Sequence, residues 1–449
     1  MTDSPPPPGA RSGFRYVLGQ RDFRLIWFAQ IAAQLADKFL MFSLIILAYR
    51  VSGANTGVAI TLLAYTLPAV AIAPLAGVFA DRHNRKVLMV WTNLVRAVLI
   101  ALIPAASLVP ALRGEYVHLL VLTFAFSAVG QLFSPAEAAA IPTVISKEAL
   151  ITANSMVLGT MVITLVLGAP LAPIVSRVEI YAPYWIATAL FLAAGALIAW
   201  ARIPSPERLQ HAGERHPFKQ LALELREGMA VLTNSPVLLL AFAELALAVL
   251  VMFMMFALAP GYVTRVLGVA EQDTYLIVVP ATIGTLLSAA TLGQLGRGWN
   301  RARLLLAALM ATGVTLLGLA LLPAVLRNFV ELQPLTRAFG ATASLLLGLE
   351  FGALMIPALS ALMEGTDESV RGRVFALLFM VVNGVSAVPV LLGAVLSDVL
   401  GPDRVIGSLG VLLAAAGVIS AGYARRVFAT TKPPRPPATG PPHRQIPPA

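Results

Sequence analysis

The sequence predicts an all-α membrane protein with twelve transmembrane helices in two six-helix bundles. Of its 449 residues, 58% are hydrophobic and only 12% are charged, which is about half the charge content of an ordinary soluble domain. A water-soluble core cannot cover so much apolar side chain, so a large part of it must face lipid. Twelve windows of about 20 mostly apolar residues can be placed along the chain, and the longest break between them separates six from six.

The windows follow one another with polar or turn-rich breaks between them. The expected spans are 24–49, 57–79, 87–109, 116–139, 151–175, 182–201, 236–259, 273–295, 303–324, 335–362, 373–397 and 404–424.

Five segments organise the chain around these spans. We expect a disordered arm at residues 1–22, a first bundle at 23–201, a cytoplasmic linker at 202–235, a second bundle at 236–425 and a disordered Pro-rich tail at 426–449. The second half of the linker has the apolar spacing of a helix. It is expected either to lie on the membrane surface or to form an ordinary linker helix.

The distribution of charge predicts the orientation. The chain carries 32 Lys and Arg against 22 Asp and Glu, a net charge of +10. With both termini in the cytoplasm, 23 basic residues fall in cytoplasmic segments and 7 in external ones, as the positive-inside rule requires. We therefore expect a multi-pass protein of the bacterial cytoplasmic (inner) membrane, and the basic charge does not indicate nucleic-acid binding. The absence of cysteine excludes disulfides and Cys-ligated metals.

The two halves share traces of an internal repeat. The segment GVFADRHNRK, Gly77 to Lys86, has a weaker counterpart in GQLGRGWNR, Gly293 to Arg301, 216 residues later. Pro135 and Pro357, near the ends of the fourth and tenth spans, are 222 residues apart. Two similar offsets in the same direction indicate a duplicated six-span unit in parallel orientation.

The loop GVFADRHNRK resembles the signature loop of the major facilitator superfamily, Gly-x-Leu-Ala-Asp-Arg-x-Gly-Arg-Lys, at the same place between the second and third spans. The resemblance covers about residues 20–425 and implies the major facilitator fold. Within the superfamily, FSPAEAAAIP from Phe133, LITAN from Leu150 and DESVRGRVFAL from Asp367 resemble the bacterial siderophore and macrolide exporters and the lysophospholipid transporter.

The resemblance implies that the signature loop acts as a cytoplasmic gate, in which Asp81 docks at the start of the eleventh span. Gly77 lacks a side chain and would allow close helix packing, and a carboxylate is favoured at a helix N-terminus. The alternative is that the loop only fixes the topology through its positive charge. The candidate gate residues are Gly77, Asp81, Arg82, Arg85, Lys86, Arg371 and Arg373.

Two departures from the pattern of drug/proton antiporters weaken the assignment of this chain to that group of the superfamily. The fourth span has no arginine between Val121 and Gln131, and the fifth span reads Gly168-Ala-Pro170 without the glycine pair that such antiporters often carry. Transport as such is unaffected by either departure.

Five ionisable residues lie far from the ends of their expected spans, near the middle or, for Glu244, about a third of the way along: Asp37, Lys38, Arg96, Glu244 and Glu350. An ionised side chain at mid-membrane costs about 2.5–3.5 kcal/mol, so five facing lipid would cost on the order of 15 kcal/mol. They must therefore be paired, protonated, directed to the interface or exposed to a water-filled cavity.

By resemblance, spans one, four, seven and ten border the central cavity, which makes Asp37 the first candidate for proton coupling. Glu244 and Glu350 are candidates from the other half, for which structural and functional roles are equally open. Arg96 is expected to be a partner, because arginine does not release its proton. The alternative for Asp37 is a structural ion pair with Arg96.

The function expected from these features is proton-coupled export of small lipophilic compounds by alternating access. The chain lacks the Gly-Lys-Ser/Thr loop of an ATPase, the HExxH pair and the GxSxG elbow, so we expect no enzyme, no catalytic residue, no cofactor and no metal. Lipid or lysophospholipid flipping is the alternative, and a transport-dead sensor a more distant one. The expected partners are the small-molecule substrate, protons and the bilayer, with the protein a monomer.

Overall fold

The computed structural model describes residues 13–109, 116–204, 217–295, 301–326 and 333–430. Within these ranges the chain forms helices and no strands. The helices are α1 (Phe14–Gly19), α2 (Arg21–Ser52), α3 (Asn55–Ala71), α4 (Ala73–Arg82), α5 (Arg85–Ala106), α6 (Tyr116–Gly130), α7 (Phe133–Val144), η2 (Lys147–Ala149), α8 (Leu150–Val178), α9 (Ala182–Trp200), α10 (Pro217–Thr233), α11 (Pro236–Arg265), η3 (Glu271–Thr274), α12 (Tyr275–Leu295), α13 (Arg301–Leu326), α14 (Gln333–Gly365), α15 (Glu368–Met380), the π-helical turn η5 (Val381–Val385), α16 (Ala387–Leu400) and α17 (Pro402–Thr430).

These helices give the twelve spans that the sequence predicts. In the described part, eleven helical stretches are long and apolar enough to cross a membrane, and the shorter α3 continues into α4 as the remaining span. Five spans in the described chain combine more than one helical element: α3 with α4, α6 with α7, η2 with α8, η3 with α12, and α15 with η5 and α16. The first break falls before Pro74 at the start of α4, because proline cannot donate the backbone hydrogen bond that would continue a helix but fits its first turn.

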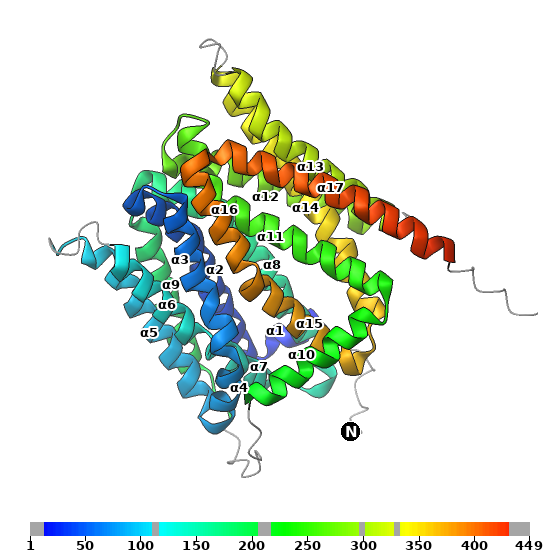
Figure 1. Ribbon diagram of the computed structural model, residues 1–449. Helices are drawn as coiled ribbons and strands as arrows, with labels where there is room; N and C mark the ends of the chain where they lie inside the picture. The colour runs from blue at the N-terminus through cyan, green and yellow to red at the C-terminus, as the bar shows by residue number, and fades with distance from the viewer. Residues whose placement is uncertain (1–12, 110–115, 205–216, 296–300, 327–332, 431–449) are drawn as a thin grey trace, which may run out of the picture.

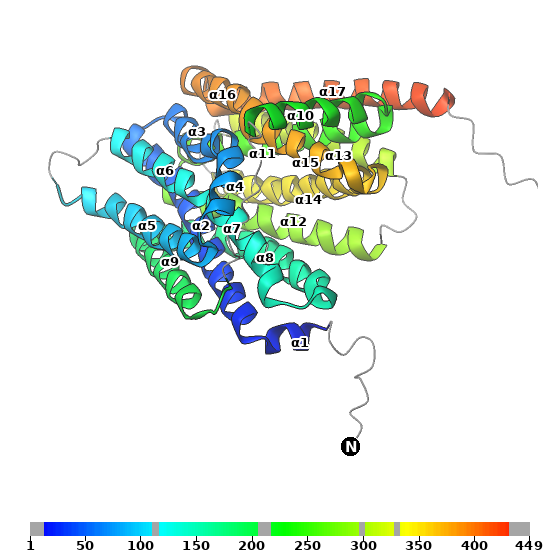
Figure 2. The same cartoon turned by 90° about the horizontal axis from the view of Figure 1, so that it is seen from below.

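The spans form two groups, α2–α9 and α11–α17, which lie side by side (Figures 1 and 2). We call the end of the bundle that carries α10 and the turn at His83–Asn84 the linker end, and the opposite end, with the turn at Gly53–Ala54 and with η3, the far end. α10 lies at the linker end against α4, α11 and α15.

Close helix packing in the second group depends on glycine. At Gly284 of α12 and Gly348 of α14, an added Cβ would clash with the backbone of the opposite helix. Without a hydrophobic effect to drive helix association in lipid, such backbone contact is a main source of packing energy between spans.

Both terminal segments differ from expectation within their described residues. The arm expected to be disordered includes α1, whose Val17 is buried with Phe23 and Ile141, because its apolar side chains have a hydrophobic surface to cover. At the other end α17 continues to Thr430, past the expected boundary. The remainder of the arm and tail, and the loop 296–300 with the second copy of the signature, lie outside the described residues.

Candidate functional site

The carboxyl group of Asp37, at the middle of α2, is held by two side chains of the same half. Its Oδ1 accepts a hydrogen bond from Arg96 Nη2 of α5 at 2.5 Å. Its Oδ2 accepts another from the Tyr65 hydroxyl of α3 at 2.6 Å. The ion pair between Asp37 and Arg96 that the sequence left as an alternative is therefore present in the structure.

The Arg96 guanidinium lies between two aromatic rings. Its Cζ is 4.2 Å from the ring centroid of Phe126 on α6 and 4.4 Å from that of Phe191 on α9. Both distances are within the range of cation–π attraction. Five helices of the first half thus meet at one cluster, which we call the Asp37 cluster: Asp37, Tyr65, Arg96, Phe126 and Phe191.

Lys38 is a weaker neighbour of this cluster. Its Nζ is 3.5 Å from Asp37 Oδ2, and a quarter of its side chain is exposed. The base of the Lys38 side chain packs against Gly168 of α8. Arg96, which is shorter in its contact and more deeply buried, is the principal partner of the carboxylate.

Glu350, at the middle of α14, also points into its own half. Its Oε1 accepts a hydrogen bond from Thr315 of α13 at 2.7 Å, while its buried Oε2 has no partner. Because Thr315 belongs to the same six-span half, the structure places the Glu350 carboxyl between two helices of the second half.

Glu244 is the most deeply buried of the predicted carboxyl groups. It lies in the third turn of α11, nearer the linker end than Asp37 and Glu350, and is 2% exposed. Neither of its carboxyl oxygens has a hydrogen-bond partner. It shares no described polar contact with the Asp37 cluster or with Glu350, so the predicted charges form separate sites.

A fourth buried carboxyl group, Glu137, was not singled out from the sequence. It lies on α7 and is 8% exposed, with Oε1 unpartnered. Two residues further along the same helix, the carbonyl oxygen of Ala139 accepts a hydrogen bond from Arg85 Nη1 at 2.8 Å. The signal available in the sequence was one acid in an apolar, alanine-rich segment between Pro135 and Pro142.

The candidate gate residues do not form one cluster but contact different partners at the linker end. Arg373 pairs with Glu227 of α10 at 2.8 Å, and Arg371 donates to the carbonyl of Thr366 at 3.2 Å. The close approach expected at Gly77 is not present, since within the described chain an added Cβ would meet nothing within 4 Å.

The remaining gate residues lie on or just after α4. Arg82 is exposed and Lys86 is half-buried in the first turn of α5. The side chain of Asp81 lies outside the part of the chain that the structure describes, so its predicted docking at α15 remains a prediction.

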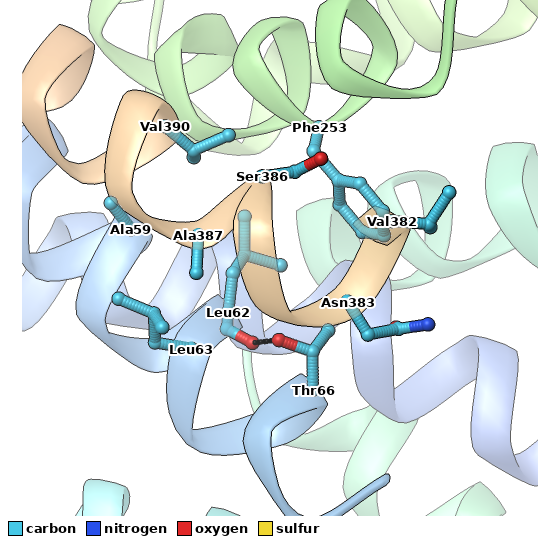
Figure 3. Close-up of a pocket in the computed structure, with 10 residues that line it drawn as sticks. All are labelled: Ala59, Leu62, Leu63, Thr66, Phe253, Val382, Asn383, Ser386, Ala387 and Val390. Carbon is cyan, nitrogen blue, oxygen red and sulfur yellow. Dashed lines mark hydrogen bonds between the residues drawn. The ribbon is translucent and has the colours of Figure 1, made fainter. Parts of the chain in front are cut away.

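A small cavity lies where the halves meet at mid-depth (Figure 3). It measures about 20 Å³, room for roughly one water molecule, whereas sites for drug-sized ligands measure about 300–1,000 Å³. Most of the wall is apolar. The lining residues are Ala59, Leu62, Leu63, Thr66, Phe253, Val382, Asn383, Ser386, Ala387 and Val390.

At the far end the halves are joined by polar contacts. Tyr49 and Thr264 share a hydrogen bond of 2.9 Å between their hydroxyl oxygens. Arg50 Nε lies 3.8 Å from Glu271 Oε1, and Arg177 Nε lies 3.4 Å from Asp273 Oδ1. The far end is therefore closed in this structure.

The family follows from a sequence match that spans most of this architecture. Residues 26–390 match the family model described as "Major Facilitator Superfamily". The chain belongs to the major facilitator superfamily. A similar member is the "Uncharacterized MFS-type transporter YvqJ" of Bacillus subtilis (strain 168), 23% identical over 408 residues that cover 89% of this chain and 91% of that protein.

Solved structures show the same superfamily fold. A POT family transporter in complex with 5-aminolevulinic acid superposes with a TM-score of 0.67 at 12% identity, covering 93% of this chain and 98% of that one. A bacterial homologue of the human lysosomal transporter Spinster, in an inward-facing, unoccupied conformation, superposes with a TM-score of 0.64 at 12% identity. The match covers 96% of this chain and 100% of that one. The nucleoside transporter NupG gives 0.63 at 12% identity, covering 92% and 99%.

The described side chains of this superfamily member offer no metal site. Among them, no group of three or more His, Cys, Asp or Glu residues is arranged to hold a metal ion. What the site residues show is an ion pair in the Asp37 cluster and buried carboxyl oxygens without a hydrogen-bond partner at Glu244, Glu350 and Glu137.

Proposed function

We propose that this protein is a secondary transporter that exports small lipophilic compounds in exchange for protons by alternating access. The observation that carries the proposal is the contrast along the contact between the halves, which is apolar at mid-depth and polar at the far end. Apolar side chains where the halves meet suit a lipophilic substrate, and polar contacts at one end can break and reform in water.

The apolar contact involves the two helices that face each other across the halves. Phe42 of α2 and Phe256 of α11 meet edge to face with ring centroids 5.3 Å apart. Phe253 of α11 lines the small cavity between the halves, and the half-buried Met252 and Met255 lie on either side of Phe253 in the sequence. Methionine side chains adapt to ligands of different shape, which supports a broad lipophilic substrate range.

Glu244 is the carboxyl group that the geometry favours for proton coupling. Asp37 is already bound by Arg96 and Tyr65, so a proton there would compete with an ion pair. At Glu244 no partner must be displaced. One proton moving down 100 mV releases about 2.3 kcal/mol, enough for a roughly 50-fold gradient of a neutral substrate.

The proposal is tested by growth of an efflux-deficient bacterium on a panel of toxic lipophilic compounds. We expect the chain to confer resistance to some of them, and Glu244→Gln to abolish it at an unchanged protein level. The matched control is Glu179→Gln, which neutralises an exposed carboxylate at the far end and should leave resistance intact. Equal sensitivity with and without the protein across the whole panel would contradict the export of such compounds.

The alternative substrate is a lysophospholipid, which the resemblance of residues 133–142 and 150–154 supports. A fluorescent lysophospholipid in proteoliposomes distinguishes the two. Movement of the lipid between leaflets, together with no effect on the drug panel, would favour lipid transport over drug export.

A further inference from the structure

Asp398, which the sequence analysis did not single out, accepts three hydrogen bonds from the other half. Asp398 lies near the end of α16. This helix contacts α3 and lies beside it in Figure 1. Its Oδ1 accepts a hydrogen bond from the backbone N–H of Asn55 at 2.8 Å. Its Oδ2 accepts one from the backbone N–H of Thr56 at 2.8 Å and another from the Thr56 hydroxyl at 2.6 Å.

These two N–H groups belong to the first turn of α3. The first N–H groups of any helix lack partners within the helix and are usually capped by a side chain just before it. Here that position is Ala54, which makes no side-chain cap. The cap of α3 is therefore supplied by a helix of the other half.

Charge reinforces this contact. A carboxylate is stabilised at the positive end of a helix dipole, and hydrogen bonds to a charged group are stronger than those between neutral groups. Arg265, at the end of α11, lies on the other side of the carboxylate, with Nη2 3.6 Å from Asp398 Oδ1 and 3.4 Å from the carbonyl of Gly53.

The neighbouring residues extend the contact. Asn55 Nδ2 donates to Ser397 Oγ at 2.8 Å, and the Asn55 side chain lies against Gly261 of α11, where an added Cβ would clash with it. The bonds made by Asn55 and Thr56 join α3 to the second half, so they break together when the far ends separate.

We propose that Asp398 is a positioning residue of the transport cycle that holds the far end closed by capping α3 across the two halves. The proposal rests on the alternating access proposed above, because a contact that holds the far end closed matters only if that end opens. We call the contact of Asp398 with Asn55 and Thr56 the latch. Loss of the carboxylate leaves the first N–H groups of α3 without their cap and shifts the protein toward far-end opening. Asp398 acts in this way without touching the substrate.

The test measures distances between spin labels in the purified full-length protein without substrate. The chain has no cysteine, so introduced pairs are labelled without background. One pair, Val117→Cys with Leu335→Cys, reports on the far end. A second pair, Val87→Cys with Met363→Cys, reports on the linker end. All four positions are exposed side chains, and each pair spans the two halves.

In Asp398→Asn we expect the ratio of far-end-open to far-end-closed molecules to rise about tenfold, which corresponds to about 1.4 kcal/mol. The far-end distance should lengthen while the linker-end distance shortens. Glu179→Gln, which removes a charge at the same end, should leave both distributions unchanged.

A purely structural role predicts something else. If Asp398→Asn broadened both pairs alike, or changed neither, the latch would be excluded. Gly261→Ala provides a second variant, since its methyl group displaces Asn55 from the closed arrangement, and it should shift both pairs in the same directions as Asp398→Asn. Because no substrate is present, the result does not depend on which compound is transported, and failure of the drug panel would leave it standing.

Discussion

At the scale of single residues, the structure shows how a membrane-embedded half holds charge. Asp37 and Arg96 neutralise each other, Tyr65 binds the second carboxylate oxygen, and Phe126 and Phe191 enclose the guanidinium. Removing one member of a buried pair leaves the other charge without a partner, which typically costs about 3–5 kcal/mol. The cluster thus stabilises the first half, and a proton that binds Asp37 must compete with the ion pair to Arg96.

This account predicts non-additive effects of substitution on thermal stability in detergent. Arg96→Met should lower the melting temperature because it leaves a buried carboxylate, and Asp37→Asn should lower it because it leaves a buried guanidinium. The double variant should lose less than the sum of the two, with a coupling energy of about 0.5–3 kcal/mol. Lys38→Met, at a longer and more exposed contact, serves as the control and should have little effect. Additive losses would show that Asp37 and Arg96 do not stabilise each other.

At the scale of elements, α10 is packed against α15, which begins at the linker end. Glu227 of α10 pairs with Arg373 of α15, but both side chains are about 40% exposed, and exposed pairs contribute only about 0–1 kcal/mol. The closer contact is at Gly228, where an added Cβ would lie 2.8 Å from the carbonyl oxygen of Arg373. Backbone proximity at Gly228, rather than the ion pair, therefore fixes α10 on α15.

We predict that Gly228→Ala detaches α10 and that Glu227→Gln does not. Hydrogen exchange of the peptide covering Pro217–Thr233 measures this, with faster exchange expected only in Gly228→Ala. Gly372→Ala is the matched control, because it adds the same methyl group to α15 at a position with no described neighbour within 4 Å. Unchanged exchange in Gly228→Ala would assign the docking of α10 to other contacts.

At the scale of the whole molecule, the two halves are held at the far end and meet through apolar side chains at mid-depth. The cavity between them has a volume of about 20 Å³ and is far too small for a drug-sized ligand, so transport requires the halves to move relative to each other. Locking the far end should therefore stop transport.

A disulfide between Asn55→Cys and Gly261→Cys provides such a lock. A Cβ at position 261 would lie 2.7 Å from Asn55 Cγ, which places the two positions within reach of a disulfide, and the chain has no competing cysteine. Oxidation should abolish transport and a reductant should restore it. Each single variant should transport at the same rate with and without the oxidant. Transport that continues in the cross-linked protein would exclude opening at the far end.

Much of this architecture could be predicted from the sequence. The twelve spans, the division into two halves and the superfamily depend on apolar runs, breaks and one loop motif, all of which are local features of the chain. The buried charges at Asp37, Arg96, Glu244 and Glu350 were recognisable for the same reason, because an ionisable residue in an apolar run is conspicuous by itself.

The sequence did not show which side chains contact one another. Asp398 lies one residue beyond its expected span and resembled a loop residue, yet it caps a helix that begins more than 300 positions earlier. Glu137 went unnoticed although it is buried, and Tyr65 could not be linked to Asp37 before the helices were placed. Hydropathy determines which segments enter the membrane, because transfer from water to lipid depends on the composition of each segment. Which side chains then meet is decided by helix packing, which brings together residues that no local pattern connects.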